Sequence, residues 1–283
     1  MICTNNKNNY DNLKLSIITI CLNEKNIEDT CKSIISQKFR NYEWIVVDGG
    51  STDGTIDIIH KYIKFINILI SEKDDGRYFA MNKGIEHALG EYILFLNGGD
   101  YLAHEFVLEN IFCYKPITGL ESISLNLQND ILHGEVSLKE NGMMPWPHWK
   151  IGPQTIDLNY FSDFHSLPHQ ATFIKRELFM KYGLYNTNYI YASDYEWFLR
   201  VIIKYGASTS YLPIIVSVYN FEGISSRSID KLPLKEAQQI FAFYQKKYIK
   251  ILIFIVKLFM PYILILILRP VWINIKKILY IIS

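Results

Sequence analysis

The sequence predicts an α/β fold with a mainly parallel sheet, and two observations support that prediction. From Leu13 to about Asn97, short apolar runs alternate with amphipathic stretches, which is typical of βαβ units. The chain has 283 residues, enough for one large α/β core and an extension. Its 29 basic and 28 acidic residues give a net charge of +1, so no global field indicates a nucleic-acid partner.

The first part of the chain is expected to hold four buried strands that alternate with three helices. The apolar runs that predict strands are residues 13–21, 42–48, 66–71 and 92–97. Apolar residues near helical spacing predict helices over residues 27–37, 52–62 and 78–89. Right-handed crossovers then place the carboxyl ends of the strands along one edge of the sheet, where open α/β folds bind ligands. The polar residues expected at that edge are Asn23, Asp48, Asp74 and Asp100.

The second part of the chain yields fewer elements. Residues 131–138 form a candidate strand, and the stretch 144–153 is rich in Pro, Trp and Gly and is expected to be a loop. Residues 193–206 are expected to be helical and to end at Gly206, a plausible C-cap. Residues 212–219 predict one more strand.

The cysteines and the N-terminus indicate the compartment. Cys3, Cys21, Cys31 and Cys113 show neither the paired spacing of a zinc site nor the density of a disulfide scaffold, so they are expected to be reduced thiols in a cytosolic setting. Residues 1–12 are polar and lack the apolar stretch of a signal peptide, which predicts a disordered tail and no export.

The segment VVDGGSTDGT is the most informative local motif. A strand stops at Asp48, glycines permit a tight turn, and Ser51 or Thr52 is expected to cap the next helix while Asp48 faces the pocket. A purely structural turn is the alternative. The segment lacks the Gly-Lys-Ser/Thr ending of a P-loop, and no Gly-x-Gly-x-x-Gly follows the first strand.

Several motifs in matching order carry a resemblance to a known family. The first part contains LSIITICLNEKNIEDTCKSIISQ, EWIVVDGGSTDGT and SEKDDGRYFAMNKGIEHALGEYILFLNGGD, and the second contains HQATFIKRELFMKYGLYN and SDYEWFLR. Over roughly Leu13 to Ser226 these segments resemble the family 2 glycosyltransferases, first their nucleotide-binding half and then their acceptor half. The resemblance implies a GT-A fold, in which a Rossmann-like nucleotide-binding sheet is flanked by helices.

The resemblance also implies contacts to the nucleoside. Asn23, Glu24 and Asp48 match the positions that hold it, and a fixed carboxylate at Asp48 suits the N–H donors of a uracil or guanine ring. A turn residue at Asn23 and an exposed acid at a helix start for Glu24 remain open as alternatives.

The segment after the third strand matches the part of the family that lies beside the diphosphate and the donor sugar. Its polar candidates are Asp74, Arg77, Asn82 and Lys83. A solvated turn at Asp74 and a solvated helix charge at Lys83 are the alternatives.

The segment LNGGD stands where the family carries an Asp-x-Asp metal motif. The first acid is replaced by Asn97 or Gly98, so Asp100 is the expected ligand of a divalent ion, Mn²⁺ or Mg²⁺. A single carboxylate is enough if phosphate oxygens and waters complete the shell. A metal-independent reaction, or a role for Asp100 as the N-cap of a helix after Tyr101, is the alternative.

For the chemistry, the resemblance points to SDYEWFLR. By its place in the motif, Asp194 is the base that takes the proton of the acceptor hydroxyl, whereas Glu196 is offset by two residues and points away on a helix. A helix N-cap is the other interpretation of Asp194. Arg200 is expected to hold the diphosphate or to form a salt bridge across the helix surface.

Residues near the acceptor side follow from the same resemblance. His169 and Gln170 stand in PHQATF, which in similar sequences lies near that side of the cleft. Trp197, like Trp146 and Trp149, offers a flat ring for a sugar face. A hydrogen-bonded structural histidine and core tryptophans are the alternatives.

Two regions follow from these features, an α/β glycosyltransferase domain over residues 13–228 and a C-terminal helical region over 229–283. Within the latter, residues 251–268 are apolar but interrupted by Lys257 and Pro261, with basic residues on both sides. This pattern favours helices that lie in the membrane interface or enter and return at the cytoplasmic face. A buried helix, a dimer interface and a full span are the alternatives.

Together these features predict an inverting glycosyltransferase. It is expected to move a sugar from a UDP-sugar, or alternatively a GDP-sugar, to a hydroxyl of a polyprenyl-diphosphate-linked glycan in surface polysaccharide synthesis. A catalytically degenerate nucleotide-sugar-binding or scaffold protein at the membrane is the main alternative. A nucleotidyltransferase is disfavoured because CLNEKNIED lacks the glycine-rich, basic loop of that class. The sequence leaves the oligomeric state open.

Overall fold

The computed structural model describes residues 2–4, 13–113, 128–139, 155–220 and 232–246. The chain divides into two compact units, Met1–Ala237 and Gln238–Ser283, and the first contains the sheet. The expected loop over 144–153 and the apolar stretch over 251–268 lie outside the described residues. Within the described residues, no helix has both the length and the apolar character that a membrane span requires.

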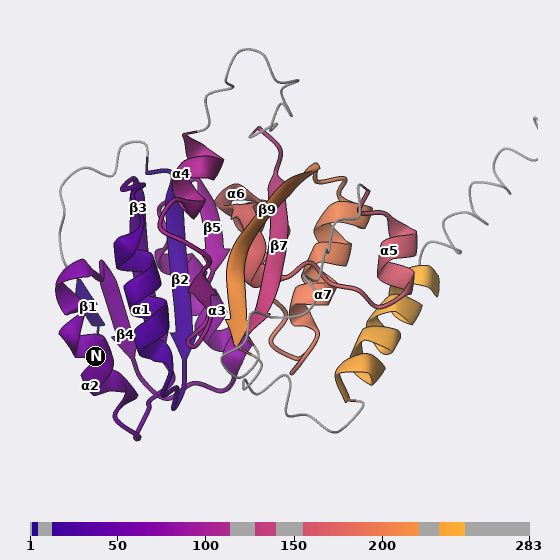
Figure 1. The fold of residues 1–283 in the computed structure, drawn as a ribbon. Coiled ribbons are helices and arrows are strands. Elements are labelled where there is room, and N and C mark those ends of the chain that lie inside the picture. Colours follow the sequence, from indigo (N-terminus) through magenta and orange to yellow (C-terminus); the bar gives the residue numbers. More distant parts are fainter. Residues whose placement is uncertain (1, 5–12, 114–127, 140–154, 221–231, 247–283) are drawn as a thin grey trace, which may run out of the picture. The chain divides into compact units, whose positions relative to one another are not determined.

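The described strands form one mixed sheet, which confirms the predicted α/β class (Figure 1). Its order is β1-β4-β3-β2-β5-β8-β7-β9-β6. Strands β2 to β5 are mutually parallel where they pair, whereas β8 pairs antiparallel with both β5 and β7. The strands are β1 Ile2–Thr4, β2 Leu15–Cys21, β3 Tyr42–Asp48, β4 Ile68–Ser71, β5 Tyr92–Phe95, β6 Tyr101–Leu102, β7 Ile131–Lys139, β8 Thr172–Lys175 and β9 Thr209–Asn220.

Helices connect the strands and cover the sheet on both faces (Figure 1). The α-helices are α1 Ile27–Ser36, α2 Thr55–Lys61, α3 Arg77–His87, α4 Val107–Phe112, α5 Leu158–Ser162, α6 Arg176–Tyr182 and α7 Ser193–Phe198. Short 3-10 turns η1 Ile63–Phe65 and η2 His169–Ala171 and the π-helix η3 Leu199–Lys204 complete the elements. Residues 232–246 are also helical.

Successive side chains of β2 point to opposite faces of the sheet, and both sets are mainly apolar, which explains why helices pack on both faces. Leu15 and Ile17 belong to one buried cluster with the apolar side of α1, while Ile18 points the other way and lies against Gly84 of α3. On that second side Phe95 of β5 packs edge-on against Phe179 of α6, with ring centroids 6.3 Å apart. A strand buried on both faces has the continuous apolar sequence that predicted it.

The start of β5 is packed tightly against β2. Gly90 donates its N–H to Ser16 Oγ, and a Cβ atom at Gly90 would lie 2.5 Å from Leu15 C and from Ser16 N. Only glycine lets the two backbones approach so closely.

Two local expectations differ from the structure, and a third is met with a change of helix type. The N-terminus is not irregular throughout, because Ile2–Thr4 pair as β1 with the edge of β4. Ser51 and Thr52 do not cap a helix: α2 begins at Thr55 and its N-cap is Gly54, which forms no side-chain cap. The expected helix over 193–206 is α7 followed by η3, and Gly206 has a φ of 72°, as expected of a C-cap glycine.

Candidate functional site

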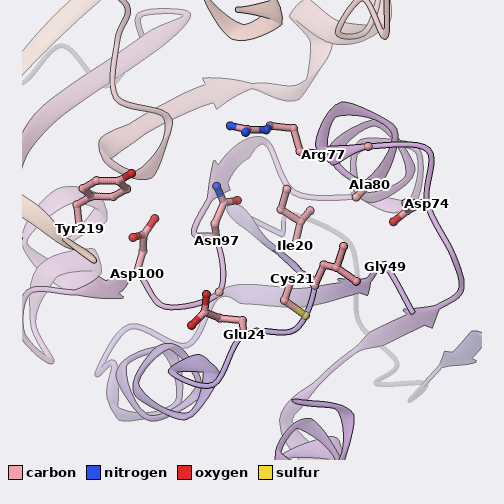
Figure 2. A pocket seen from close by; sticks show the side chains of 13 residues that line it. Ile20, Cys21, Glu24, Gly49, Asp74, Arg77, Ala80, Asn97, Asp100 and Tyr219 are labelled. Atoms are coloured by element: carbon pink, nitrogen blue, oxygen red, sulfur yellow. The ribbon is translucent and has the colours of Figure 1, made fainter. Parts of the chain in front are cut away.

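A pocket lies at the carboxyl edge of β2, β3 and β5, where open α/β sheets bind ligands. The end of β2, the loops after β2, β3, β4 and β5, the start of α3 and the end of β9 line it with Ile20, Cys21, Leu22, Glu24, Gly49, Asp74, Gly76, Arg77, Ala80, Asn97, Gly98, Asp100 and Tyr219. Figure 2 shows Glu24, Asp100 and the ring of Tyr219 on one side and Asp74 on the opposite side. The structure thus brings together four of the predicted site residues, Glu24, Asp74, Arg77 and Asp100.

Asp48 lies behind the pocket wall. Its side chain is fully buried and accepts hydrogen bonds from Ser51, through N–H and Oγ–H, and from Ser71 Oγ at 2.7 Å. Asp48 also lies beside Cys21, whose thiol pKa is raised by burial and then by the charge of Asp48. In the structure Asp48 therefore fixes the glycine turn instead of facing the pocket.

Asn23 and Glu24 shape the loop after β2. Asn23 has a φ of 52° and accepts a hydrogen bond from Thr52 N–H at 2.8 Å, so the turn interpretation describes its geometry. The Glu24 N–H donates to Thr55 Oγ1 and the Glu24 carboxylate accepts from Asn26 N–H. Glu24 lines the pocket and Asn23 does not.

Asp74 is paired on one oxygen and open on the other. Lys83 binds Asp74 Oδ1 and also Glu72 at 2.6 Å, so its charge is shared by two carboxylates. The second oxygen, Asp74 Oδ2, is buried and has no hydrogen-bond partner in the part of the chain that the structure describes. Asn82 lies elsewhere and pairs through its amide with the backbone N–H and C=O of Tyr185.

Asn97 and Asp100 supply oxygen atoms of the kind that Mg²⁺ and Mn²⁺ bind. Both line the pocket, and Asn97 Oδ1 is buried with no hydrogen-bond partner among the described residues. Over the described parts of the chain, no group of three His, Cys, Asp or Glu side chains is arranged to hold a metal ion. An ion at Asp100 would therefore need oxygens from a bound diphosphate and water. The alternative N-cap role of Asp100 is wrong, because β6 follows it and α4 begins at Val107.

Asp194 stands in the first turn of α7 and is held by α3. The Tyr78 hydroxyl lies 2.9 Å from Asp194 Oδ1 and 2.8 Å from Tyr191 O. Burial, and then the charge of Asp194, raises the pKa of Tyr78 well above its ordinary value, so the hydroxyl stays protonated as a donor. The N-cap of α7 is Ala192, so Asp194 does not cap the helix.

His169 links Asp194 to the pocket. Its Nδ1 lies 3.9 Å from Asp194 Oδ2, and its Nε2 lies 2.8 Å from Asn97 Nδ2. Burial lowers the pKa of His169 and the charge of Asp194 opposes that change, with the net shift downward. A neutral imidazole therefore stands between the pocket and Asp194 at pH 7.

Three other predicted residues lie in the packing behind the site. Trp197 is fully buried, stacks on Phe179 at 4.3 Å between ring centroids and donates to Gly183 O. Arg200 pairs with Glu196 at 3.0 Å and donates to the carbonyls of Tyr182 and Leu184, which matches the salt-bridge alternative. Gln170 is buried in η2.

Several residues near the site carried no sequence signal. Tyr78 follows the predicted Arg77 directly, yet its partner Asp194 is 116 residues away. Tyr219 reaches the pocket from the last described strand. Glu236 accepts three backbone N–H groups of the loop before α7. Only the fold brings these groups to the site.

Comparisons of sequence agree with this geometry. Residues 16–112 match the family model described as Glycosyl transferase family 2. The PGL/p-HBAD biosynthesis glycosyltransferase of Mycobacterium bovis is 30% identical over 225 residues, which are 78% of this chain and 82% of that protein. The putative teichuronic acid biosynthesis glycosyltransferase TuaG of Bacillus subtilis is 40% identical over 90 residues, 30% of this chain and 36% of TuaG.

Solved structures share the fold at lower sequence identity. S. aureus TarS 1-349 in complex with UDP-GlcNAc has a TM-score of 0.61 at 20% identity, over 80% of this chain and 65% of that one. The mannosyltransferase PcManGT from Pyrobaculum calidifontis, in complex with GDP-Man and Mn²⁺, has a TM-score of 0.51 at 20% identity, over 74% of this chain and 57% of that one. These likenesses support the predicted GT-A-like sheet with flanking helices.

Proposed function

Because the chain belongs to the family 2 glycosyltransferases, we propose that it transfers a sugar with inversion from a UDP-sugar, or alternatively a GDP-sugar, to the hydroxyl of a lipid-linked glycan. The observation that carries this proposal is the pocket at the carboxyl ends of the strands, which Asp74, Arg77 and Asp100 line. Asn97 at its wall contacts His169, which in turn lies beside Asp194. Such an arrangement suits a donor with a base at one end and a diphosphate at the other.

Charge and buried hydrogen-bond acceptors at the pocket wall support a donor site here. Asp74 Oδ2 is buried, unpartnered and at the pocket wall, so it is the acceptor offered to the N–H of a uracil or guanine ring. Arg77 lines the same pocket and carries the positive charge that a diphosphate needs. TarS in complex with UDP-GlcNAc and PcManGT in complex with GDP-Man share the fold, which supports both nucleotides as candidates.

A divalent ion fits at Asp100, with Asn97 Oδ1 as a second oxygen at the same wall. When bound, the ion would offset the negative charge that develops on the diphosphate leaving group. The mannosyltransferase PcManGT, which shares the fold, was solved in complex with Mn²⁺. Mn²⁺ and Mg²⁺ are therefore the ions to test first.

Asp194 is the proposed base. Inverting transfer needs a carboxylate that accepts the proton of the acceptor hydroxyl while the oxygen attacks the anomeric carbon from the side opposite the diphosphate. Asp194 is partly exposed, held at 2.9 Å by Tyr78, and linked through His169 to Asn97 at the pocket wall. Its fixed position beside the donor pocket supports this role.

The acceptor and the location of the enzyme complete the proposal. A basic-flanked apolar segment over residues 251–268 suits a peripheral or re-entrant attachment to the cytoplasmic face of the cell membrane. A polyprenyl-diphosphate-linked acceptor in the same membrane would be concentrated beside the enzyme. Transfer to soluble acceptors alone, by protein that stays bound to membranes without this segment, would count against the lipid-linked acceptor.

Calorimetric titration of the full chain in detergent tests the donor site. UDP, GDP and their sugar conjugates are titrated with Mn²⁺, with Mg²⁺ and with chelator, and consumption of the bound donor is then measured with a glycan acceptor. Metal-dependent binding of one nucleotide followed by turnover supports the proposal. Binding without turnover supports the degenerate scaffold instead, and no binding of any nucleotide refutes the donor site.

A further inference from the structure

One carboxylate holds the loop in front of the proposed base. Glu236 accepts hydrogen bonds from three consecutive backbone N–H groups, those of Ile190 at 2.9 Å, Tyr191 at 2.7 Å and Ala192 at 2.7 Å. Glu236 Oε1 accepts from Ile190, and Oε2 accepts from both Tyr191 and Ala192. Glu236 and this loop belong to the same compact unit, Met1–Ala237.

These contacts fix the residues that lead directly into α7. The N-cap of α7 is Ala192, whose side chain has no acceptor, and no side-chain cap is present. Glu236 accepts from the N–H of this N-cap residue itself, and its negative charge stands near the positive end of the helix. Hydrogen bonds that involve a charged group are about twice as strong as neutral ones. The start of α7 is therefore anchored from 44 residues away.

The same loop is held from its other side by α3. The Tyr191 carbonyl accepts from the Tyr78 hydroxyl, which also contacts Asp194, and the Arg77 guanidinium lies 5.8 Å from the centre of the Tyr191 ring. Glu236 thus fixes the N–H groups of a loop whose carbonyl and ring contact the residues beside the base. A movement of this loop would shift the start of α7, which carries Asp194, relative to Tyr78 on α3.

We propose that Glu236 is a positioning residue for the transfer reaction, because its carboxylate holds loop 190–192 so that Asp194 keeps its orientation toward the acceptor hydroxyl. The inference rests on the proposed function, in which Asp194 is the base. Glu236 acts only through the loop and contacts none of the residues that line the donor pocket through a described hydrogen bond. Loss of the Glu236 carboxylate should therefore lower the rate of the chemical step more than the affinity for the donor.

Glu236→Gln tests this role in the full chain. The amide keeps the size of the side chain but removes its charge and one acceptor, so amides 190–192 should exchange hydrogen for deuterium faster. A shift of the base by about 1 Å costs up to about a hundredfold in rate, so kcat should fall tenfold to a hundredfold. The donor KM and the UDP affinity should change by a smaller factor than kcat, since the loop contacts the donor pocket through the Tyr191 ring beside Arg77, whereas it leads directly into the turn that carries Asp194. Glu236→Asp, which keeps the charge, should recover part of kcat.

Two further variants make the result specific. Lys235→Gln changes one charge at the exposed neighbouring position and should leave kcat and exchange unchanged. In the double variant Asp194→Asn with Glu236→Gln, loss of the base should leave Glu236 nothing to position, so kcat should equal that of Asp194→Asn alone. Independent, multiplying losses would overturn the proposal.

The remaining outcomes are distinct from a failure of the proposed function. A wild-type kcat in Glu236→Gln, or an equal loss of kcat and UDP affinity with a large fall in melting temperature for both Gln and Asp variants, would overturn the positioning role. A wild-type chain that binds nucleotides but transfers no sugar would overturn the proposed function. In that case unchanged exchange of amides 190–192 in Glu236→Gln would also refute the loop-holding contact itself.

Discussion

Replacing Asp194 by Asn removes the proposed base and little else. Asn has nearly the same shape and keeps an oxygen for the Tyr78 hydroxyl, which lies 2.9 Å from Asp194 Oδ1. A positioned general base contributes about 10²-fold to 10⁴-fold, or roughly 2.7 to 5.4 kcal/mol of transition-state stabilisation. The neutral His169 ring, 3.9 Å from Asp194 Oδ2, offers a partial substitute base. We therefore expect kcat/KM to fall by about 10²-fold to 10³-fold, toward the lower end of that range.

Initial rates of sugar transfer at saturating acceptor, together with calorimetric UDP affinity, measure this effect. The exposed Asp163, changed by the same Asp→Asn substitution, is the matched control and should retain full activity. In Asp194→Asn the residual rate should decline only below pH 6.5, because burial lowers the pKa of His169 and the neutral ring is the active form. The reasoning is refuted if Asp194→Asn keeps kcat/KM within threefold of the wild type while its UDP affinity is unchanged.

Three other perturbations test separate parts of the structure. Asp100→Asn should weaken Mn²⁺-dependent UDP binding by about tenfold in calorimetry while binding in chelator stays the same, and equal weakening in both would remove Asp100 from the metal site. His133 is buried with its pKa lowered to about 4, so the unfolded state binds more protons between that value and 6.5 and stability is lost as pH falls through this window. His133→Phe should therefore reduce the loss of urea stability between pH 7 and pH 5 by about 2 kcal/mol, and an unchanged loss would show that other groups cause it. Gly90→Ala should destabilise the fold by about 1 to 3 kcal/mol in urea denaturation, because its Cβ would lie 2.5 Å from backbone atoms of β2, and a stability equal to wild type would contradict that contact.

Local sequence predicts the first half of the fold because its elements are set by nearby residues. Strand β3 has the predicted bounds, Tyr42–Asp48, since a continuous apolar run ends at a glycine turn. Strand β8 carries no comparable signal: its four residues become a strand through antiparallel pairing with β5 and β7, which are distant in sequence. The same holds for β1, which pairs with the edge of β4.

In the candidate site, too, some residues are predicted by their position in the sequence and others depend on the fold. Asp74 and Asp100 follow strand ends, and that position alone predicts their place at the pocket. Asp48 also follows a strand end, yet its carboxylate accepts hydrogen bonds from Ser51 and Ser71 and thereby stabilises the loop after β3. Sequence spacing gives the position of a residue along the sheet edge, whereas the direction of its side chain depends on partners that only the fold supplies.

The contact of Glu236 with the loop before α7 has a practical consequence for anyone who shortens this chain. A boundary at residue 228, where the sequence places the end of the α/β domain, removes Glu236 and leaves three adjacent N–H groups without their acceptor. The compact unit itself continues to Ala237. A truncated enzyme prepared for crystals or inhibitor screens should therefore end beyond that residue, so that these three N–H groups keep their acceptor.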